Sequence, residues 1–247
     1  MTRWKASFIH LILSLLVIGT VAAYIIYFWY PLPLMHMSKA DKLLLMVGGI
    51  DLIVGPLLTL LVYKQGKKTL RMDLTVIAVV QAAFLSLGLY AIYQSRPVFL
   101  VATPTRLDMV FANEIDTTRL SKAKIERFKT LSLTKPLLVG AKMPTDIEEK
   151  NNIVMSALAG MGDIQTMPEY YVEYQELIPD ILQNSLPLQV SQKVSEEALA
   201  VMQEAAKNYG YQPNELRYMH LGSARGYAIM LLDAKTGQIV GPVNLDI

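Results

Sequence analysis

The chain has 247 residues, of which 53% are hydrophobic and 18% are charged, and its net charge is only +2. Apolar residues are concentrated in the N-terminal part, which indicates a membrane region followed by a water-facing domain. The absence of cysteine excludes disulfides, thiol chemistry and cysteine-ligated metals. The small net charge gives no reason to expect nucleic-acid binding.

Three hydrophobic stretches, residues 8–30, 43–63 and 74–93, are each predicted to be a transmembrane helix. About 20 residues at 1.5 Å per residue cross the roughly 30 Å of hydrocarbon in a bilayer. The first stretch is longer than the apolar core of a cleavable signal and ends in aromatic residues at 24, 27, 28, 29 and 30. We expect it to be an uncleaved anchor whose aromatic end lies at the membrane surface.

The short connections carry the charges that set orientation. Arg3 and Lys5 precede the first stretch, and the connection between the second and third stretches carries four basic residues, namely Lys64, Lys67, Lys68 and Arg71. The other connection has only Lys39 and Lys42. Because basic loops stay in the cytoplasm, the N-terminus is predicted to be cytoplasmic and everything after Arg96 external, which in a bacterium means the periplasm.

Residues 97–247 are long enough for one compact domain with its own core, and their pattern predicts an α+β fold. Residues 97–101 and 106–111 are expected to form a pair of strands around a turn at Thr103-Pro104. Helices are expected at residues 125–130, 147–160 and 195–208. The residues at 226–232 and 238–243 flank a loop with aspartate first and glycine last, which predicts a hairpin.

The second stretch contains one ionisable residue, Asp51, at a depth where a charge is costly and by default functional. Helical spacing places Gly48, Asp51, Gly55 and Thr59 on one face. Small residues let another helix approach closely, and polar residues can hydrogen-bond across the contact. Pro56 adds a backbone break because it has no N–H to donate. We therefore interpret this polar stripe as a face that receives another helix.

The helix that meets this stripe could come from the same chain or from another protein. Within the chain, Gln81 with Ala78 and Gly88 offers a small and polar face on the third stretch, and His10 with Ser14 offers one on the first. Proton transport is a third interpretation of Asp51, but a single acid without a relay supports it poorly.

No catalytic or metal site is predicted. Intramembrane aspartyl chemistry needs two carboxylates close together, and Asp73 lies at the opposite membrane edge, roughly 18 Å from the depth of Asp51. His10, His36 and His220 lack the spacing of metal ligands. We expect neither enzymatic activity nor a cofactor.

The external segment at residues 169–174 is rich in tyrosine. Tyr170, Tyr171 and Tyr174 could anchor a partner, because exposed tyrosines offer a large contact area at little cost in rotamer entropy. The favoured alternative is that they pack into the core of their own domain with their hydroxyl groups hydrogen-bonded.

Several local motifs resemble those of the TfpX/TfpZ family of type IV pilin accessory proteins, most strongly in the first 101 residues. The motifs are Arg3-Trp4-Lys5, Trp29-Tyr30-Pro31, Asp51 with Gly55-Pro56-Leu57-Leu58-Thr59-Leu60, Gln81, Arg96-Pro97-Val98-Phe99-Leu100-Val101 and the terminal Leu232-Asp233-Ala234-Lys235-Thr236-Gly237.

The resemblance implies a protein of the Gram-negative inner membrane that assists the major pilin before or during assembly, with other pilus-assembly machinery as a further class of partner. The leading hypothesis is a chaperone-like protein whose intramembrane face, made of Gly48, Asp51, Gly55, Pro56, Thr59 and Gln81, binds the pilin helix. The alternative is a sensor that passes a periplasmic signal to a separate cytoplasmic partner.

Overall fold

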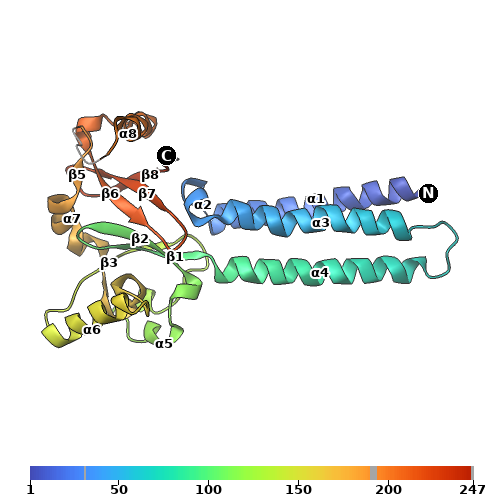
Figure 1. Ribbon diagram of the computed structural model, residues 1–247, viewed down its shortest axis with the longest axis horizontal. Helices are drawn as coiled ribbons and strands as arrows, with labels where there is room; N and C mark the ends of the chain where they lie inside the picture. Colours follow the sequence, from blue (N-terminus) through green and yellow to red (C-terminus); the bar gives the residue numbers. More distant parts are fainter. Residues whose placement is uncertain (31, 190–193, 246–247) are drawn as a thin grey trace.

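The computed structural model describes residues 1–30, 32–189 and 194–245, and it divides into an elongated helical bundle and an α+β domain (Figure 1). Three long apolar helices come first, and a domain built on a mixed sheet follows. This confirms the predicted fold class. Pro31, which belongs to one of the motifs described above, lies outside the described residues.

The bundle consists of α1 (Arg3–Phe28), α3 (Ala40–Val62) and α4 (Leu70–Gln94). Each is long and apolar enough to cross a membrane. The short helix α2 (Leu32–Ser38), which the sequence pattern did not reveal, joins α1 to α3. Large apolar side chains cover the outside of the bundle, and exposure on this scale is typical of a surface that faces lipid.

One sheet of eight strands forms the frame of the domain, in the order β4-β3-β1-β2-β6-β7-β8, with β5 also pairing with β6. The strands β1 and β3 run parallel, as do β2 and β6, and the other pairs are antiparallel. The bounds are β1 (Pro97–Ala102), β2 (Arg106–Phe111), β3 (Leu137–Ala141), β4 (Tyr171–Val172), β5 (Leu186–Pro187), β6 (Leu216–Gly222), β7 (Tyr227–Asp233) and β8 (Ile239–Val243). Both predicted strand pairs, β1 with β2 and β7 with β8, are confirmed.

Among the described residues of the domain, four α-helices cover the sheet: α5 (Thr117–Leu120), α6 (Ile147–Leu158), α7 (Ile178–Asn184) and α8 (Glu196–Asn208). The helices predicted at residues 147–160 and 195–208 are confirmed as α6 and α8. Asp146 and Ser195 cap them, since each side chain accepts a hydrogen bond from a backbone N–H in the first turn of the following helix. The helix predicted at residues 125–130 is wrong, since only a 3₁₀ turn forms there. The 3₁₀ turns are Ala112–Glu114, Glu126–Phe128, Ile164–Thr166, Pro168–Tyr170, Tyr174–Leu177 and Pro213–Glu215.

The sheet has apolar clusters on both faces, so the central strand β1 is buried throughout its length. One cluster includes Ile153 of α6, and another includes Ile181 of α7. The second of these also contains Leu34 and Met37 of α2. A helix that belongs to the membrane region by sequence therefore contributes to the core of the external domain.

Polar contacts hold the domain to the end of the bundle. The Tyr30 hydroxyl donates to the carbonyl of Ser95 at 2.7 Å, and its side chain is fully buried. From the turn between β6 and β7, Arg225 reaches the carbonyls of Ser95 and Ser38 at 3.1 and 3.4 Å. Trp29 donates to the carbonyl of Leu133 at 2.9 Å. These bonds fix the domain against the helices.

Candidate intramembrane binding groove

The polar stripe of α3 faces the interior of the bundle. Gly48, Asp51, Gly55, Pro56 and Thr59 are all buried, and the exposed fractions of Asp51 and Thr59 are 6% and 2%. Residues between them, such as Ile50 and Ile53, are exposed to the surroundings. The helical spacing therefore places these five residues on one face that other helices of this chain cover.

On one side, α1 meets the stripe with two polar side chains. The Ser7 hydroxyl donates to the carbonyl of Pro56 at 2.8 Å, and His10 Nδ1 lies 2.6 Å from Thr59 Oγ1, within hydrogen-bonding distance. A Cβ atom added at Gly48 would lie 2.9 Å from Ile18 Cγ2. Close approach of α1 thus depends on a small residue at position 48.

On the other side, α4 contributes Gln81. Its amide donates to the backbone carbonyl of Asp51 at 3.2 Å and lies directly against Gly55, where a Cβ atom would overlap the amide group. Gly88, seven residues after Gln81 on α4 and nearer to the domain, provides a second close approach between α4 and α3. A Cβ atom added at Gly88 would lie 2.6 Å from Val47 Cγ1 of α3. The Gln81 face predicted from the sequence is therefore in contact with the stripe.

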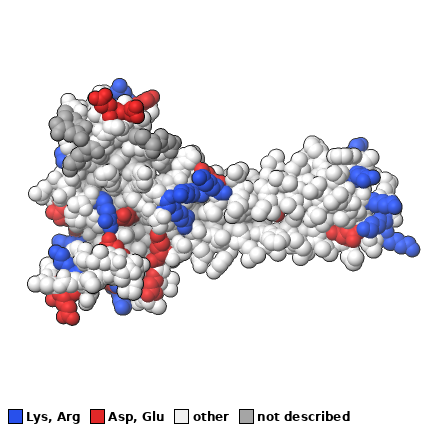
Figure 2. Space-filling view, viewed as in Figure 1, with Lys and Arg blue, Asp and Glu red and all other residues white. Residues whose placement is uncertain are grey.

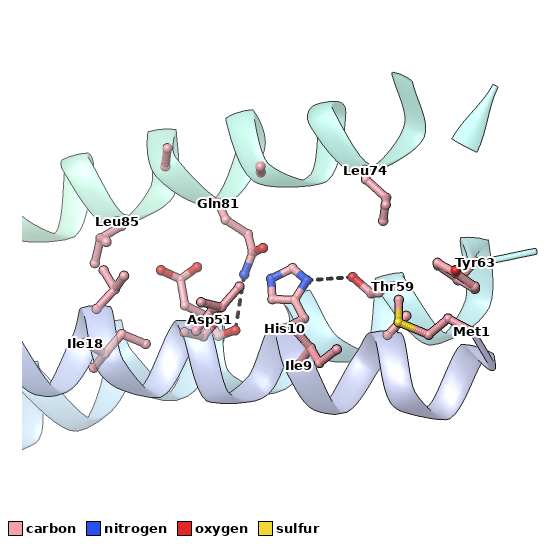
Figure 3. Close-up of a pocket in the computed structure, with 16 residues that line it drawn as sticks. Met1, Ile9, His10, Ile18, Asp51, Thr59, Tyr63, Leu74, Gln81 and Leu85 are labelled. Carbon is pink, nitrogen blue, oxygen red and sulfur yellow. Dashed lines mark hydrogen bonds between the residues drawn. The ribbon is translucent and has the colours of Figure 1, made fainter. Parts of the chain in front are cut away.

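Although α1 and α4 both pack on α3, a groove of about 480 Å³ remains between them. Its floor includes Asp51 and Thr59, its walls come from α1 and α4, and Figure 3 shows His10, Asp51 and Gln81 pointing toward one another across it. Most of the remaining lining is apolar, including Leu13, Val17, Ala78 and Leu85.

The groove closes toward the external domain. There the space between the helices shrinks to a cavity of about 10 Å³, lined by side chains such as Ile18, Val21, Val47 and Leu89. The N-terminal segment from Met1 to Ile18, most of which belongs to α1, lines the open part over roughly 25 Å at 1.5 Å per residue. The opening thus occupies the part of the bundle that is remote from the domain.

A single carboxylate lines the described part of the groove, and the nearest titratable group is His10. Asp73 lies at the far end of the bundle, where it pairs with Lys67 at 2.6 Å. The described residues also contain no cluster of side chains suited to hold a metal ion. With one acid, one imidazole and an amide in an apolar channel, the groove is equipped to hydrogen-bond a polar group within the membrane.

The tyrosine segment lies in the external domain and does not adjoin the groove. Tyr171 and Tyr174 are buried, with exposed fractions of 0% and 3%. Tyr171 donates to the carbonyl of Gln165, and Tyr174 donates to the carbonyl of Gly237 at 2.6 Å. Burial raises the pKa of Tyr174 to about 12. A side chain enclosed in the core offers no surface to a partner, so the core-packing interpretation holds for both.

Tyr170 is only half-buried, and its hydroxyl donates to Glu149 Oε1 at 2.9 Å. Burial and the adjacent Glu149 carboxylate raise the pKa of Tyr170 to about 12. Of the three tyrosines, it alone keeps surface that a partner could contact.

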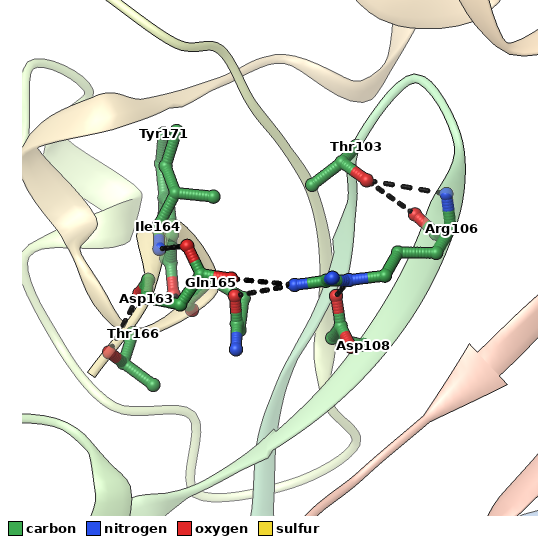
Figure 4. A network of polar contacts seen from close by, with 8 residues as sticks. All are labelled: Thr103, Arg106, Asp108, Asp163, Ile164, Gln165, Thr166 and Tyr171. Carbon is green, nitrogen blue, oxygen red and sulfur yellow. Dashed lines mark hydrogen bonds and ion pairs between the residues drawn. The ribbon is translucent and has the colours of Figure 1, made fainter. Parts of the chain in front are cut away.

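One polar network in the domain was not predicted (Figure 4). Arg106 at the start of β2 donates to Asp108 at 2.7 Å, and from its other end to Asp163 at 2.8 Å and Gln165 at 3.2 Å. Burial raises the pKa of Asp108 although Arg106 opposes this effect. The network ties β2 to a segment more than fifty residues away, and no local pattern in the sequence signals such a contact.

Comparison with known proteins gives a consistent picture. The family model for the fimbrial assembly protein FimB matches residues 1–39. The fimbrial assembly proteins of serogroups I and E1 of Dichelobacter nodosus are 28% and 27% identical to this chain over 249 residues, which covers 98% of the chain and 95% of each relative. No solved structure gives a significant match.

A shorter relative is more similar over part of the chain. The fimbrial assembly protein of serogroups C1 and C2 of Dichelobacter nodosus is 37% identical over 99 residues, which covers 39% of this chain and 76% of that protein. The full-length similarity to the other two relatives extends the match through the external domain. The chain belongs to the fimbrial assembly protein family.

Proposed function

We propose that this chain is a non-enzymatic accessory protein of type IV pilus assembly that acts like a chaperone for the major pilin. In this proposal it resides in the inner membrane of a Gram-negative bacterium and holds a pilin subunit before or during assembly. The family membership supports a role in pilus assembly. The groove between α1 and α4 is the observation that carries the step from assembly to pilin binding.

A pilin subunit waits in the membrane as one hydrophobic helix with an external head. The open groove lies in the membrane region, has apolar walls and runs for roughly 25 Å along α1, enough for several turns of a helix. A helix seated there would pack against α1 and α4 and cover the floor at Asp51. The bundle would then have four helices around a polar centre instead of three.

The polar groups of the groove define the chemistry of the guest. The Asp51 carboxylate favours a hydrogen-bond donor at the same depth, because in hydrocarbon an unsatisfied polar group is costly on both sides of the contact. A guest helix without a polar residue at that depth would leave Asp51 with Gln81 and His10 as its polar neighbours among the described residues.

The proposed orientation places the N-terminus in the cytoplasm and the α+β domain in the periplasm. Figure 2 shows basic side chains gathered at the end of the bundle that is remote from the domain, with few charges along its length. This end contains Arg3, Lys5 and the connection from Lys64 to Arg71. Basic residues that flank short loops are retained on the cytoplasmic side.

Site-specific photocrosslinking from α4 tests the groove directly. Ala78 and Leu85 line the groove, whereas their neighbours Val79 and Phe84 are more than half exposed on the outside of the bundle. A crosslinking residue at 78 or 85 is expected to capture the pilin, and one at 79 or 84 is expected to capture little. Equal pilin yields from the two faces would refute groove binding.

Substitution of Asp51 provides an independent test. Asp51→Leu removes the hydrogen-bonding group, so recovery of the pilin with the purified protein should fall, while Asp51→Asn keeps an acceptor and should retain part of it. Asp73→Leu at the far end of α4 is the matched control, since its carboxylate pairs with Lys67 away from the groove centre. Unchanged recovery with Asp51→Leu at normal expression would contradict the proposal.

A further inference from the structure

A second cleft lies where the bundle meets the external domain. It has a volume of about 380 Å³ and is lined by His36, Lys39, Asp41, Lys42, Arg225 and Tyr227, among others. These residues come from the end of α2, the junction at Lys39, the start of α3, the turn between β6 and β7, and the first residue of β7. Figure 2 shows basic side chains gathered at this junction. Because the apolar helices end here, the cleft lies at the level of the lipid headgroups.

Three cations of the cleft form no close ion pair among the described residues. In the described ranges, Lys39, Lys42 and Arg225 form no ion pair with a carboxylate. Arg225 is nevertheless held in place, because its guanidinium lies 3.7 Å from the centre of the Phe111 ring and one of its nitrogens donates to backbone carbonyls. A fixed guanidinium with donors to spare is well suited to bind a phosphate.

The backbone at Lys39 supports a role for its side chain. Its φ of 55° lies in the left-handed region, and no other described residue except glycine has a positive φ. Glycine or asparagine would fit this conformation better, and the lysine side chain does not cap the helix that follows. Neither the backbone conformation nor capping of the following helix therefore explains why a lysine occupies position 39.

Asp41, which lines the cleft, carries a buried acceptor that lacks a donor. Asp41 Oδ2 lies 3.0 Å from His36 Nδ1, but Asp41 Oδ1 is buried and has no hydrogen-bond partner among the residues that the structure describes. A buried carboxylate oxygen without a donor is destabilising, and the Asp41 side chain is 31% exposed, so a rotation of the carboxylate that presents this oxygen to a ligand N–H would be favourable.

We propose that this cleft binds the headgroup of a membrane phospholipid, with Lys39, Lys42 and Arg225 holding the phosphate and Asp41 accepting a hydrogen bond from the ammonium of ethanolamine. The cleft combines three cations that form no close ion pair with one carboxylate oxygen that lacks a donor, and these two features match a headgroup that carries a phosphate and an N–H donor. The acyl chains would run along α3, where Leu45 and Met46 are 78% and 61% exposed one turn into the membrane.

Lipid retention by the intact protein tests this proposal without any pilin. The full chain is purified in detergent, depleted of lipid and mixed with phosphatidylethanolamine or phosphatidylcholine of identical acyl chains, and bound lipid is counted by native mass spectrometry. Choline has no N–H to donate, so phosphatidylethanolamine should bind about tenfold more tightly. Equal binding of the two lipids by the unaltered protein would overturn the ammonium assignment.

Substitutions separate the two halves of the site. Lys39→Gln with Lys42→Gln should weaken binding of both lipids, whereas Lys64→Gln with Lys68→Gln removes the same charge at the far end and should change nothing. Asp41→Asn should abolish the preference for ethanolamine but keep phosphatidylcholine binding. If the first pair has no effect while the protein keeps its thermal stability, the phosphate assignment is wrong.

Two further probes identify the source of the phosphate. Phosphatidylglycerol has no ammonium group, so it should bind less tightly than phosphatidylethanolamine. The proposal would be overturned if phosphatidylglycerol bound more tightly and if Asp41→Asn increased its binding further. That result would show that the cleft is a site for anions and that the Asp41 carboxylate repels them. Soluble glycerophosphoethanolamine should compete poorly because it lacks acyl chains. Competition at a concentration equal to that of the lipid would mean that the cleft binds a free phosphate ester and no membrane component.

Discussion

Gly88 is the position where the packing of the bundle can be tested most directly. An alanine methyl there would lie 2.6 Å from Val47 Cγ1 and 2.8 Å from Val47 Cγ2. Valine in a helix has one strongly preferred rotamer, so Val47 cannot turn aside, and α3 and α4 would have to separate. An added methyl at Gly49 meets nothing within 4 Å, which makes Gly49→Ala the matched control.

The magnitude follows from comparing these two variants. Both replace glycine with alanine in a helix, which by propensity alone favours the folded state by up to about 1 kcal/mol. Only Gly88→Ala also forces a methyl group into an occupied space, which typically costs about 1–3 kcal/mol. The free energy of unfolding of Gly88→Ala should therefore be lower than that of Gly49→Ala by about 1–3 kcal/mol.

Reversible unfolding of the full chain in mixed micelles, followed by tryptophan fluorescence during titration with a denaturing detergent, measures this difference. Equal stabilities, or a more stable Gly88→Ala, would show that α3 and α4 do not approach as closely as the structure indicates. The α4 wall of the groove would then also be placed incorrectly.

Three further changes have distinct expected outcomes. In Gly55→Ala the added methyl group meets the flexible end of the Gln81 side chain, so the Gln81 amide should turn into the groove. Because only a flexible side chain has to move, the free energy of unfolding should change by less than about 1 kcal/mol. Recovery of the pilin should fall, because the amide then occupies part of the groove. Tyr174→Phe leaves a buried carbonyl without its donor and should lower the free energy of unfolding by about 1–2 kcal/mol, while Tyr170→Phe, whose hydroxyl contacts an exposed carboxylate, should change it by less than about 0.5 kcal/mol in denaturant unfolding. Hydrogen bonds from the backbone of the turn that contains Asp233 lower the pKa of its carboxyl group in the folded protein. The ionised Asp233 therefore stabilises the fold at pH values above the ordinary carboxyl pKa of about 4, which applies to the unfolded chain, and this stabilisation is lost as pH falls through the lower pKa of the folded protein. Asp233→Ala should therefore be destabilising at neutral pH and approach the stability of the unaltered chain at strongly acidic pH in thermal unfolding.

Local patterns in the sequence predicted the elements that depend on neighbouring residues. The long apolar helices, the caps at Asp146 and Ser195, and the hairpin closed by Asp233 and Gly237 all rest on interactions within a few residues. The polar stripe belongs to the same class, because a helix of known period fixes which residues share a face. Its burial by α1 and α4 follows from the cost of exposing polar groups to lipid.

Features that depend on distant contacts were not predictable. The strand β6 lies near the middle of the sheet and pairs in parallel with β2, more than a hundred residues earlier in the chain. Its sequence, Leu216–Gly222, mixes arginine and histidine with apolar residues and gives no clear alternation. The groove itself depends on how α1 and α4 diverge on either side of α3, and no pattern within one helix sets that angle.

The contact between α2 and the external domain changes how partner specificity has to be tested. Exchange of the external domain between relatives at Arg96 is the natural experiment to ask which part recognises the pilin head. However, Leu34 and Met37 of α2 pack in the core of that domain, with exposed fractions of 8% and 5%, and Arg225 binds the carbonyl of Ser38. A domain exchanged at Arg96 alone would therefore meet a foreign α2 in its core.

The exchange should accordingly carry residues 32–38 together with the domain. Because Tyr30, Trp29 and Arg225 fix the domain against the helices, the groove keeps a constant separation from any surface of the domain that contacts the pilin head. A pilin held at both points must match that separation as well as each surface. If the preference for a particular pilin follows the exchanged domain only when α2 accompanies it, the junction itself takes part in recognition. If preference stays with the bundle in both exchanges, the groove alone selects the pilin.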